Sequence, residues 1–233
     1  QTIWKIVAED YAGLDVNVTT QEPSVDKMTR TASADNTYGV RLVITRDFTT
    51  SVNQPCSCGG FAYVGVFSST SEFYKPAFVF FNNLGNAKNV AEATSHEAGH
   101  NLGLSHDGTT STGYYNGHGS GETGWAPIMG VGYSRNLVQW SKGEYANANQ
   151  KQDDYLVMQN QGVPFDADEH GNSAGTATAL SGSVVNGLQQ FKANGVLQGP
   201  NDSDHVSFVA NAGTLNIDVK SLGTNTGNAD LLV

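Results

Sequence analysis

The sequence predicts an α/β domain over residues 1–163, followed by a small all-β unit over residues 164–233. In the first part, helical runs stand on both sides of a series of strand-like runs, which is typical of a sheet layered with helices. In the second part, short alternating runs follow a stretch rich in Gly, Pro and acidic residues. A chain of 233 residues has room for one large domain or for two.

The elements of the first part follow from the spacing of their apolar residues. Residues 3–14 have helical spacing, and Gly13 stands near the end of this run. The helix that carries HEAGH comes later, and a further helix is expected from about Ser141 to Gln159, with Ser141 and Glu144 in a capping-box pattern. Between the first helix and HEAGH, four runs read as strands: VNVTT (16–20), RLVITR (41–46), FAYVGVF (61–67) and PAFVFFN (76–82).

The second part begins with a linker over about residues 162–178, which contains Pro, Gly and acidic residues and has no apolar period. Beyond the linker, the alternating runs FKANGVL, HVSFVA, GTLNIDVK and ADLLV predict short strands.

Composition and charge exclude several classes of partner. The net charge of −10 disfavours binding to nucleic acid or to anionic membranes. No apolar run approaches the roughly 20 residues that cross a bilayer. Few Lys and many Gly, Asn, Ser and Thr predict a secreted, extracellular protein. Cys56 and Cys58 are one residue apart, so they form a disulfide if the chain turns at Gly59–Gly60, and otherwise remain two unpaired thiols.

The stretch HEAGHNLGLSHD, residues 96–107, carries the chemistry. His96 and His100 are four residues apart, so on a helix both side chains project from one face and can bind one metal ion. Glycine permits positive φ, so Gly103 can end the helix and let His106 return to the same ion. Three imidazoles leave one position open, which is typical of a catalytic rather than a structural zinc.

The same spacing assigns a base. Glu97 stands one step round the helix from His96, beside the metal but not aimed at it. Neutral imidazoles leave zinc its full charge, which lowers the pKa of a bound water. Glu97 is then expected to take the proton as this water attacks a carbonyl, and to pass it to the leaving amine. The motif therefore predicts zinc-dependent hydrolysis of peptide bonds without a covalent intermediate.

The stretch HEAGHNLGLSHD resembles the extended zinc signature of the metzincin endopeptidases, and Asp107 after the third histidine is similar to the adamalysin (reprolysin) branch. The resemblance covers roughly residues 1–160. It implies a metzincin-type domain with a mixed twisted sheet, a zinc-binding helix, and an irregular lower subdomain with a methionine turn and a C-terminal helix. WAPIMG supplies Met129 for that turn, 23 residues after His106.

The resemblance also implies roles for other residues. Asp107 is expected to tie the zinc helix to the lower part of the fold. In this family the strand two before the zinc helix is a sheet edge that pairs with extended substrate, and FAYVGVF matches it. The implied substrate-binding residues are Ala62, Tyr63, Val64, Gly65 and Val66, unless FAYVGVF is an interior strand. An inhibitory propeptide, hence a zymogen, is expected for the family, and we expect the enzyme to be a monomer.

The sequence departs from some relatives. In astacins and serralysins a Tyr two residues after the turn methionine can also ligate zinc, but this chain has Val131 there, and Tyr133 stands four residues after Met129. The C-terminal part, from about Asn172 through NDSDHVSFVANAGTLNIDV, resembles prepeptidase C-terminal domains of secreted bacterial proteases. We assign that part no catalytic role.

Calcium is a further candidate ligand of the second part. Four carboxylates there offer the oxygen ligands that calcium prefers, although their spacing matches no known calcium loop: Asp166, Asp168, Asp202 and Asp204.

Two other functions compete with a secreted zinc endopeptidase. The first is a metzincin-like scaffold that binds peptides without cleaving them. Loss of the glutamate would indicate such a scaffold, but Glu97 is present. The second is a zinc hydrolase acting on something other than protein, because the zinc signature itself carries no information about the substrate.

Overall fold

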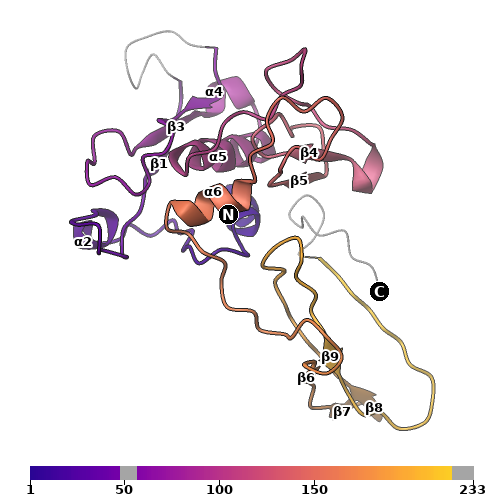
Figure 1. Ribbon diagram of the computed structural model, residues 1–233. Helices are drawn as coiled ribbons and strands as arrows, with labels where there is room; N and C mark the ends of the chain where they lie inside the picture. Colours follow the sequence, from indigo (N-terminus) through magenta and orange to yellow (C-terminus); the bar gives the residue numbers. More distant parts are fainter. Residues whose placement is uncertain (48–56, 222–233) are drawn as a thin grey trace.

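A computed structural model of the protein describes residues 1–47 and 57–221 (Figure 1). In the described chain up to α6 there are one three-stranded sheet, one two-stranded sheet and the helices around them. Its elements are α1 (Thr2–Asp10), α2 (Val25–Met28), β1 (Leu42–Thr45), β2 (Gly60–Phe61), β3 (Ala77–Phe80), α4 (Phe81–Leu84), α5 (Ala87–Asn101), η1 (Gly121–Thr123), β4 (Trp125–Pro127), β5 (Leu137–Gln139) and α6 (Asp154–Asn160). This mixed α/β arrangement agrees with the predicted fold class at that level of detail.

The larger sheet has the order β1-β3-β2, with β3 in the middle. β1 pairs with β3 in parallel, and β2 pairs with β3 antiparallel, which leaves β2 at an edge. Val79 and Phe80 of β3 are fully buried because α5 packs on this sheet. The predicted strands over 41–46 and 76–82 are therefore confirmed at their centres.

The first predicted helix is confirmed as α1, which packs along α5. The Tyr11 hydroxyl donates to the carbonyl of Ser95 in α5 (3.0 Å), and the Trp140 indole N–H donates to the carbonyl of Asp10 (2.7 Å). The rings of Tyr11 and Trp140 meet edge to face at 5.1 Å. Helix α1 thus joins the zinc-signature helix to the chain that follows β5.

Two predicted strands are wrong in whole or in part. Residues 16–20 are irregular, because their β-branched side chains find no ladder partner among the described residues; Val18 instead accepts from the Trp4 indole at 2.8 Å. The run FAYVGVF contributes only Phe61 to the sheet. The chain then turns at Gly65, whose φ is +69° and whose N–H bonds to the end of α5.

The predicted helix from Ser141 is mostly wrong, because the structure forms only its last part, α6. Gly143 and Asn147 have φ of +75° and +60°, which interrupts a right-handed helix. The predicted capping residues bond within a turn instead: the Ser141 hydroxyl donates to the Glu144 carboxylate at 3.0 Å.

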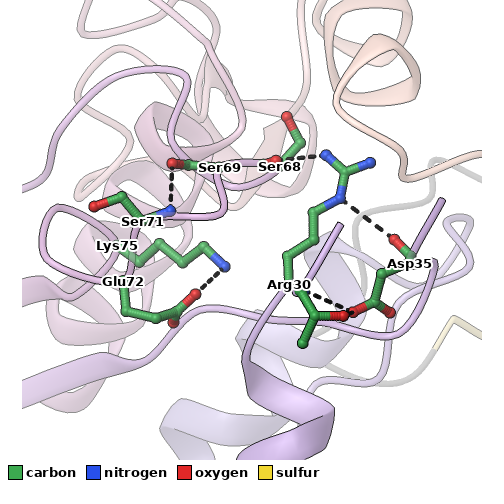
Figure 2. Close-up of polar contacts among 8 residues, drawn as sticks. Arg30, Asp35, Ser68, Ser69, Ser71, Glu72 and Lys75 are labelled. Carbon is green, nitrogen blue, oxygen red and sulfur yellow. Dashed lines mark hydrogen bonds and ion pairs between the residues drawn. The ribbon is translucent and has the colours of Figure 1, made fainter. Parts of the chain in front are cut away.

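A cluster of cations fixes the segment that leads away from β2 (Figure 2). Arg30 donates to the carbonyl of Ser68 and lies 4.7 Å over the ring of Tyr38. The buried Lys75 ammonium pairs with Glu72 at 2.7 Å and lies 5.6 Å from the same ring centroid. These contacts hold the connection between β2 and β3 against the loop that precedes β1.

The described part of the chain after α6 forms short strands, set apart from α5 in Figure 1. β6 pairs with β9 in parallel, and β7 pairs with β8 as an antiparallel hairpin. Their bounds are β6 (Thr178–Ala179), β7 (Ser183–Val185), β8 (Leu188–Gln190) and β9 (Val206–Ser207). The boundary at residue 163 and a separate all-β unit stay predictions.

Candidate metal centre

The helix that carries the signature is well defined at its start. The Asn86 side chain caps α5 by accepting the N–H of Asn89 at 3.0 Å, as expected for an N-cap. Helical geometry then places His96 and His100 on one face, as predicted from their spacing, and their ring centroids lie 4.8 Å apart.

The end of α5 brings the third histidine back. The N–H of Gly103 bonds to the carbonyl of His100 at 2.9 Å, and the N–H of Leu104 bonds to that of Gly99 at 3.0 Å. These two bonds form a Schellman motif, which requires a left-handed residue, and Gly103 has φ of +97°. The chain reverses, so His106 comes within 4.7 Å of His100, measured between ring centroids.

The three histidines present converging nitrogens. One ligand nitrogen from each of His96, His100 and His106 lies within 4.8 Å of the other two. Nδ1 of His96 lies 2.9 Å from the carbonyl of Ile128, and Nδ1 of His100 lies 2.8 Å from that of Leu104. A carbonyl only accepts, so both Nδ1 atoms carry the proton and both Nε2 atoms present a lone pair.

The electrostatics keep these imidazoles neutral. Burial lowers the pKa of His96 to about 3, with a further contribution from His100. Burial and the charge of His100 lower the pKa of His106 to about 4, and burial also lowers the pKa of His100. Nε2 of His100 lies 2.9 Å from Nε2 of His106, so two of the candidate ligand nitrogens are close neighbours. Three neutral imidazoles with converging lone pairs fit a zinc ion.

Glu97 lies beside this group as a buried carboxylate. Its side chain is 6% exposed, and burial raises its pKa to about 8. Within the described residues, its Oε2 has no hydrogen-bond partner, which is costly unless a ligand or substrate supplies one. Gly60 of β2 covers the other oxygen, since a methyl group added at Gly60 would lie 2.7 Å from Oε1. The edge strand therefore touches Glu97 directly.

Met129 lies in a tight turn beneath α5. The N–H of Gly130 bonds to the carbonyl of Pro127 at 3.0 Å, and Met129 is fully buried. A methyl group added at Gly99 would lie 2.6 Å from its sulfur, so sulfur and helix are in close contact. The structure thus brings Met129 under the histidine-bearing turn of α5.

Asp107 lies where the chain after His106 meets the turn that contains Met129. Its N–H bonds to the carbonyl of Met129 at 2.9 Å, and its side chain is 1% exposed. Burial and the charge of Glu144 raise its pKa to about 7. Its backbone links the chain after the histidines to the methionine turn, while a role for its carboxylate stays a prediction.

The predicted substrate residues lie outside the sheet. Tyr63 and Val64 are exposed. The carbonyl of Tyr63 accepts from the Asn101 side-chain amide at 3.0 Å, and the N–H of Gly65 donates to the backbone carbonyl of His100 at 2.9 Å. Ala62 and Val66 flank them in irregular chain. Substrate binding by Ala62–Val66 stays a prediction, and two of its backbone groups are already bonded to α5.

Two tyrosines stand at the site without having been predicted there. The hydroxyl of Tyr114 lies 3.3 Å from Nε2 of His106, and their ring centroids are 4.3 Å apart. Burial, followed by the charge of Glu97, raises the pKa of Tyr133 to about 12. Both residues lie in irregular loops, so no periodicity along the sequence connects them to the histidines. For Tyr114, the available signal was its place in a pair of adjacent tyrosines, Tyr114 and Tyr115, soon after the signature.

The remaining predicted sites have separate outcomes. Asp168, Asp202 and Asp204 each offer an oxygen within 4.8 Å of the others, without Asp166, so calcium stays a prediction. Cys56 lies outside the described residues, and its disulfide with Cys58 stays a prediction as well. In the described chain, no helix has the length and apolar character needed to cross a membrane.

Comparison with known proteins agrees with the geometry. A reprolysin model described as metallo-peptidase family M12 matches residues 17–141, which is more than half of the chain. The matched segment includes all three histidines, Glu97 and Met129. A search of curated proteins gave no match.

Proposed function

The chain belongs to metallo-peptidase family M12 and is a zinc metalloendopeptidase, and from this premise we propose that His96, His100 and His106 hold the zinc while Glu97 is the catalytic base. The observation that carries the proposal is the convergence of three neutral imidazole nitrogens beside a buried carboxylate with an unpartnered oxygen. Helix α5 positions His96 and His100, and the turn at Gly103 positions His106.

The roles of the protein groups follow from their positions. A zinc ion at this site supplies a Lewis acid that activates water and polarises the substrate carbonyl. Glu97 accepts the proton of the attacking water at Oε2 and later donates it to the leaving amine. Burial raises the proton affinity of this carboxylate, and the positive charge of a zinc ion beside it would oppose that shift and favour the ionised form that accepts the proton. Gly60 confines the carboxylate on its other side.

We place the peptide substrate along β2, because this strand is at the edge of the sheet and Gly60 lies against Glu97. An extended peptide that adds as a strand is positioned by backbone hydrogen bonds, while pockets for its alternate side chains would set the sequence preference. Met129 and Asp107 support the histidines from below in this proposal.

The composition supports an extracellular setting, because Lys is scarce and Gly, Asn, Ser and Thr are frequent. Secretion, an inhibitory propeptide and a monomeric state are proposals that follow from the composition and the family resemblance. Fractionation of the producing cells and the elution volume of the purified enzyme would test the first and the last.

The decisive experiment compares the parent with Glu97→Ala and Glu97→Gln. Caseinolysis and zinc content are measured on the same preparations, and thermal melting confirms that the variants are folded. We expect about one zinc in all three proteins and caseinolysis in the parent alone. Zinc in all three without caseinolysis in the parent would favour the binding scaffold or a non-protein substrate.

A further inference from the structure

Tyr114 is held next to the histidines by the backbone of its neighbour. The N–H of Tyr115 bonds to the carbonyl of Asp107 at 2.7 Å, and the N–H of Val131 bonds to the carbonyl of Tyr115 at 2.9 Å. The glycine-rich loop is therefore fixed at this point between the chain after His106 and the chain after the methionine turn. These bonds hold the backbone at position 114 beside the segment that carries His106.

The side chain of Tyr114 faces the point where the imidazole nitrogens converge. Its ring lies 4.3 Å from the ring of His106 and 6.1 Å from the ring of His96, measured between centroids. Its hydroxyl is 3.3 Å from Nε2 of His106, the atom that itself lies 2.9 Å from Nε2 of His100. The phenol oxygen thus lies next to one of the converging nitrogens.

The contact of the Tyr114 hydroxyl with His106 is compatible with a ligand position for the phenol oxygen. Zinc–ligand bonds of roughly 2.0–2.1 Å in a tetrahedron place neighbouring ligand atoms about 3.3–3.4 Å apart. The separation of 3.3 Å between the Tyr114 oxygen and His106 Nε2 matches this edge. A His106 Nε2 whose lone pair is directed at zinc cannot also accept a hydrogen bond from the phenol, so a hydroxyl this close to it is placed to bind the same ion.

Other tyrosines fit the position less well. Val131 occupies the place where some relatives have a ligating tyrosine. The hydroxyl of Tyr133 lies 3.3 Å from a methyl group added at Gly59, on the side of β2. Among the tyrosines of the described residues, Tyr114 is the one whose hydroxyl lies within 3.5 Å of a nitrogen of His96, His100 or His106.

We infer that Tyr114 is a fourth protein ligand to the metal in the substrate-free enzyme, an inference that rests on the zinc site of the proposed function. The position that three imidazoles leave open is then filled by the Tyr114 oxygen, whose proton passes to solvent on binding. Tyr114 is 46% exposed, so its side chain has room to leave when the substrate arrives. Access to the metal therefore requires displacement of this side chain.

The test uses the full chain with copper(II) in place of zinc. A phenolate bound to copper(II) gives a charge-transfer band in the visible range, and imidazole ligands alone do not. We expect the band in the parent, its loss in Tyr114→Phe and its retention in Tyr115→Phe. Tyr115 is the matched control, because it lies in the same loop and its hydroxyl contacts His118 at 3.0 Å instead.

A second readout is zinc affinity, measured by competition with a chelator. Loss of an outer-shell partner typically weakens metal binding about tenfold or more. We expect Tyr114→Phe to raise the zinc dissociation constant at least as much, and Tyr115→Phe to leave it unchanged.

The outcomes separate the two proposals. A parent that binds one zinc and cleaves casein but shows no copper band would overturn the assignment of Tyr114 and leave the proposed function standing. A band that survives in Tyr114→Phe overturns it as well, and a band lost in Tyr133→Phe instead would assign the ligand to Tyr133. A parent that binds neither metal would refute the proposed function together with this inference.

Discussion

The substitution Gly60→Ala tests whether the edge strand positions the catalytic base. A methyl group at this position would lie 2.7 Å from Glu97 Oε1 and 2.6 Å from the carbonyl oxygen of Phe78. Ordinary contact requires 3.4 Å, so the Glu97 carboxylate has to retreat by about 0.7 Å. A misplacement of about 1 Å at a catalytic group can cost on the order of 100-fold in rate. We therefore expect kcat/KM to fall roughly 10-fold to 100-fold, or about 2 kcal/mol in activation free energy.

The assay is kcat/KM on a quenched fluorescent peptide, with zinc content and thermal melting measured in parallel. The clash with Phe78 is expected to cost about 1–3 kcal/mol of stability, so the melting temperature should fall by several degrees while zinc is retained. Gly175→Ala is the control, because a methyl group there meets nothing within 4 Å. Unchanged kcat/KM in a zinc-loaded Gly60→Ala enzyme would refute the contact between β2 and the base.

Three further predictions follow from the structure. Gly103→Ala forces φ of +97° on a residue with a side chain and should cost about 1–2 kcal/mol in urea unfolding, with weaker zinc binding; unchanged stability would contradict the Schellman turn. Asp154 is 1% exposed, and burial raises its pKa to about 8. Its folded pKa lies above its unfolded value, so the stability it contributes is full below the unfolded pKa near 3.8 and declines towards pH 8, by about 1.4 kcal/mol per pH unit. Asp154→Asn should reduce the pH slope of the unfolding free energy by about 1.4 kcal/mol per pH unit between about pH 5 and pH 7.5, and urea melts with an unchanged slope would show that Asp154 is ionised. If the carboxylates of Asp168, Asp202 and Asp204 bind calcium, then EGTA should lower the melting temperature of the parent and not that of Asp202→Asn; identical melts with and without EGTA would argue against the site.

Several features could be predicted because they depend on local spacing. The interval of four residues between His96 and His100 places them on a common face once a helix forms. The end of α5 requires a residue in the left-handed backbone conformation, and Gly103 is the residue type that adopts it most readily. The apolar run around Val79 predicts a buried strand because it is short and rich in aromatic residues.

The predicted strand over residues 16–20 and the predicted helix from Ser141 are wrong because local propensity does not include the partners that each element needs in three dimensions. Residues 16–20 are rich in β-branched side chains, but a strand also needs a neighbouring strand in register, which propensity does not supply. The pattern of Ser141 and Glu144 matches a capping box, yet the positive φ of Gly143 turns the same side chains into a local turn. In both places the missing information was non-local.

By itself, the sequence predicted a histidine triad for zinc and an adjacent glutamate as base, because those groups lie within eleven residues whose spacing imposes their geometry, and the resemblance of this stretch to the metzincins indicated the class of reaction. Only the tertiary structure decided what surrounds them. Gly60 against Glu97 and Tyr114 against His106 join residues from separate loops and strands. Such contacts are set by how the sheet, α5 and the methionine turn pack, so no periodicity along the chain contains them.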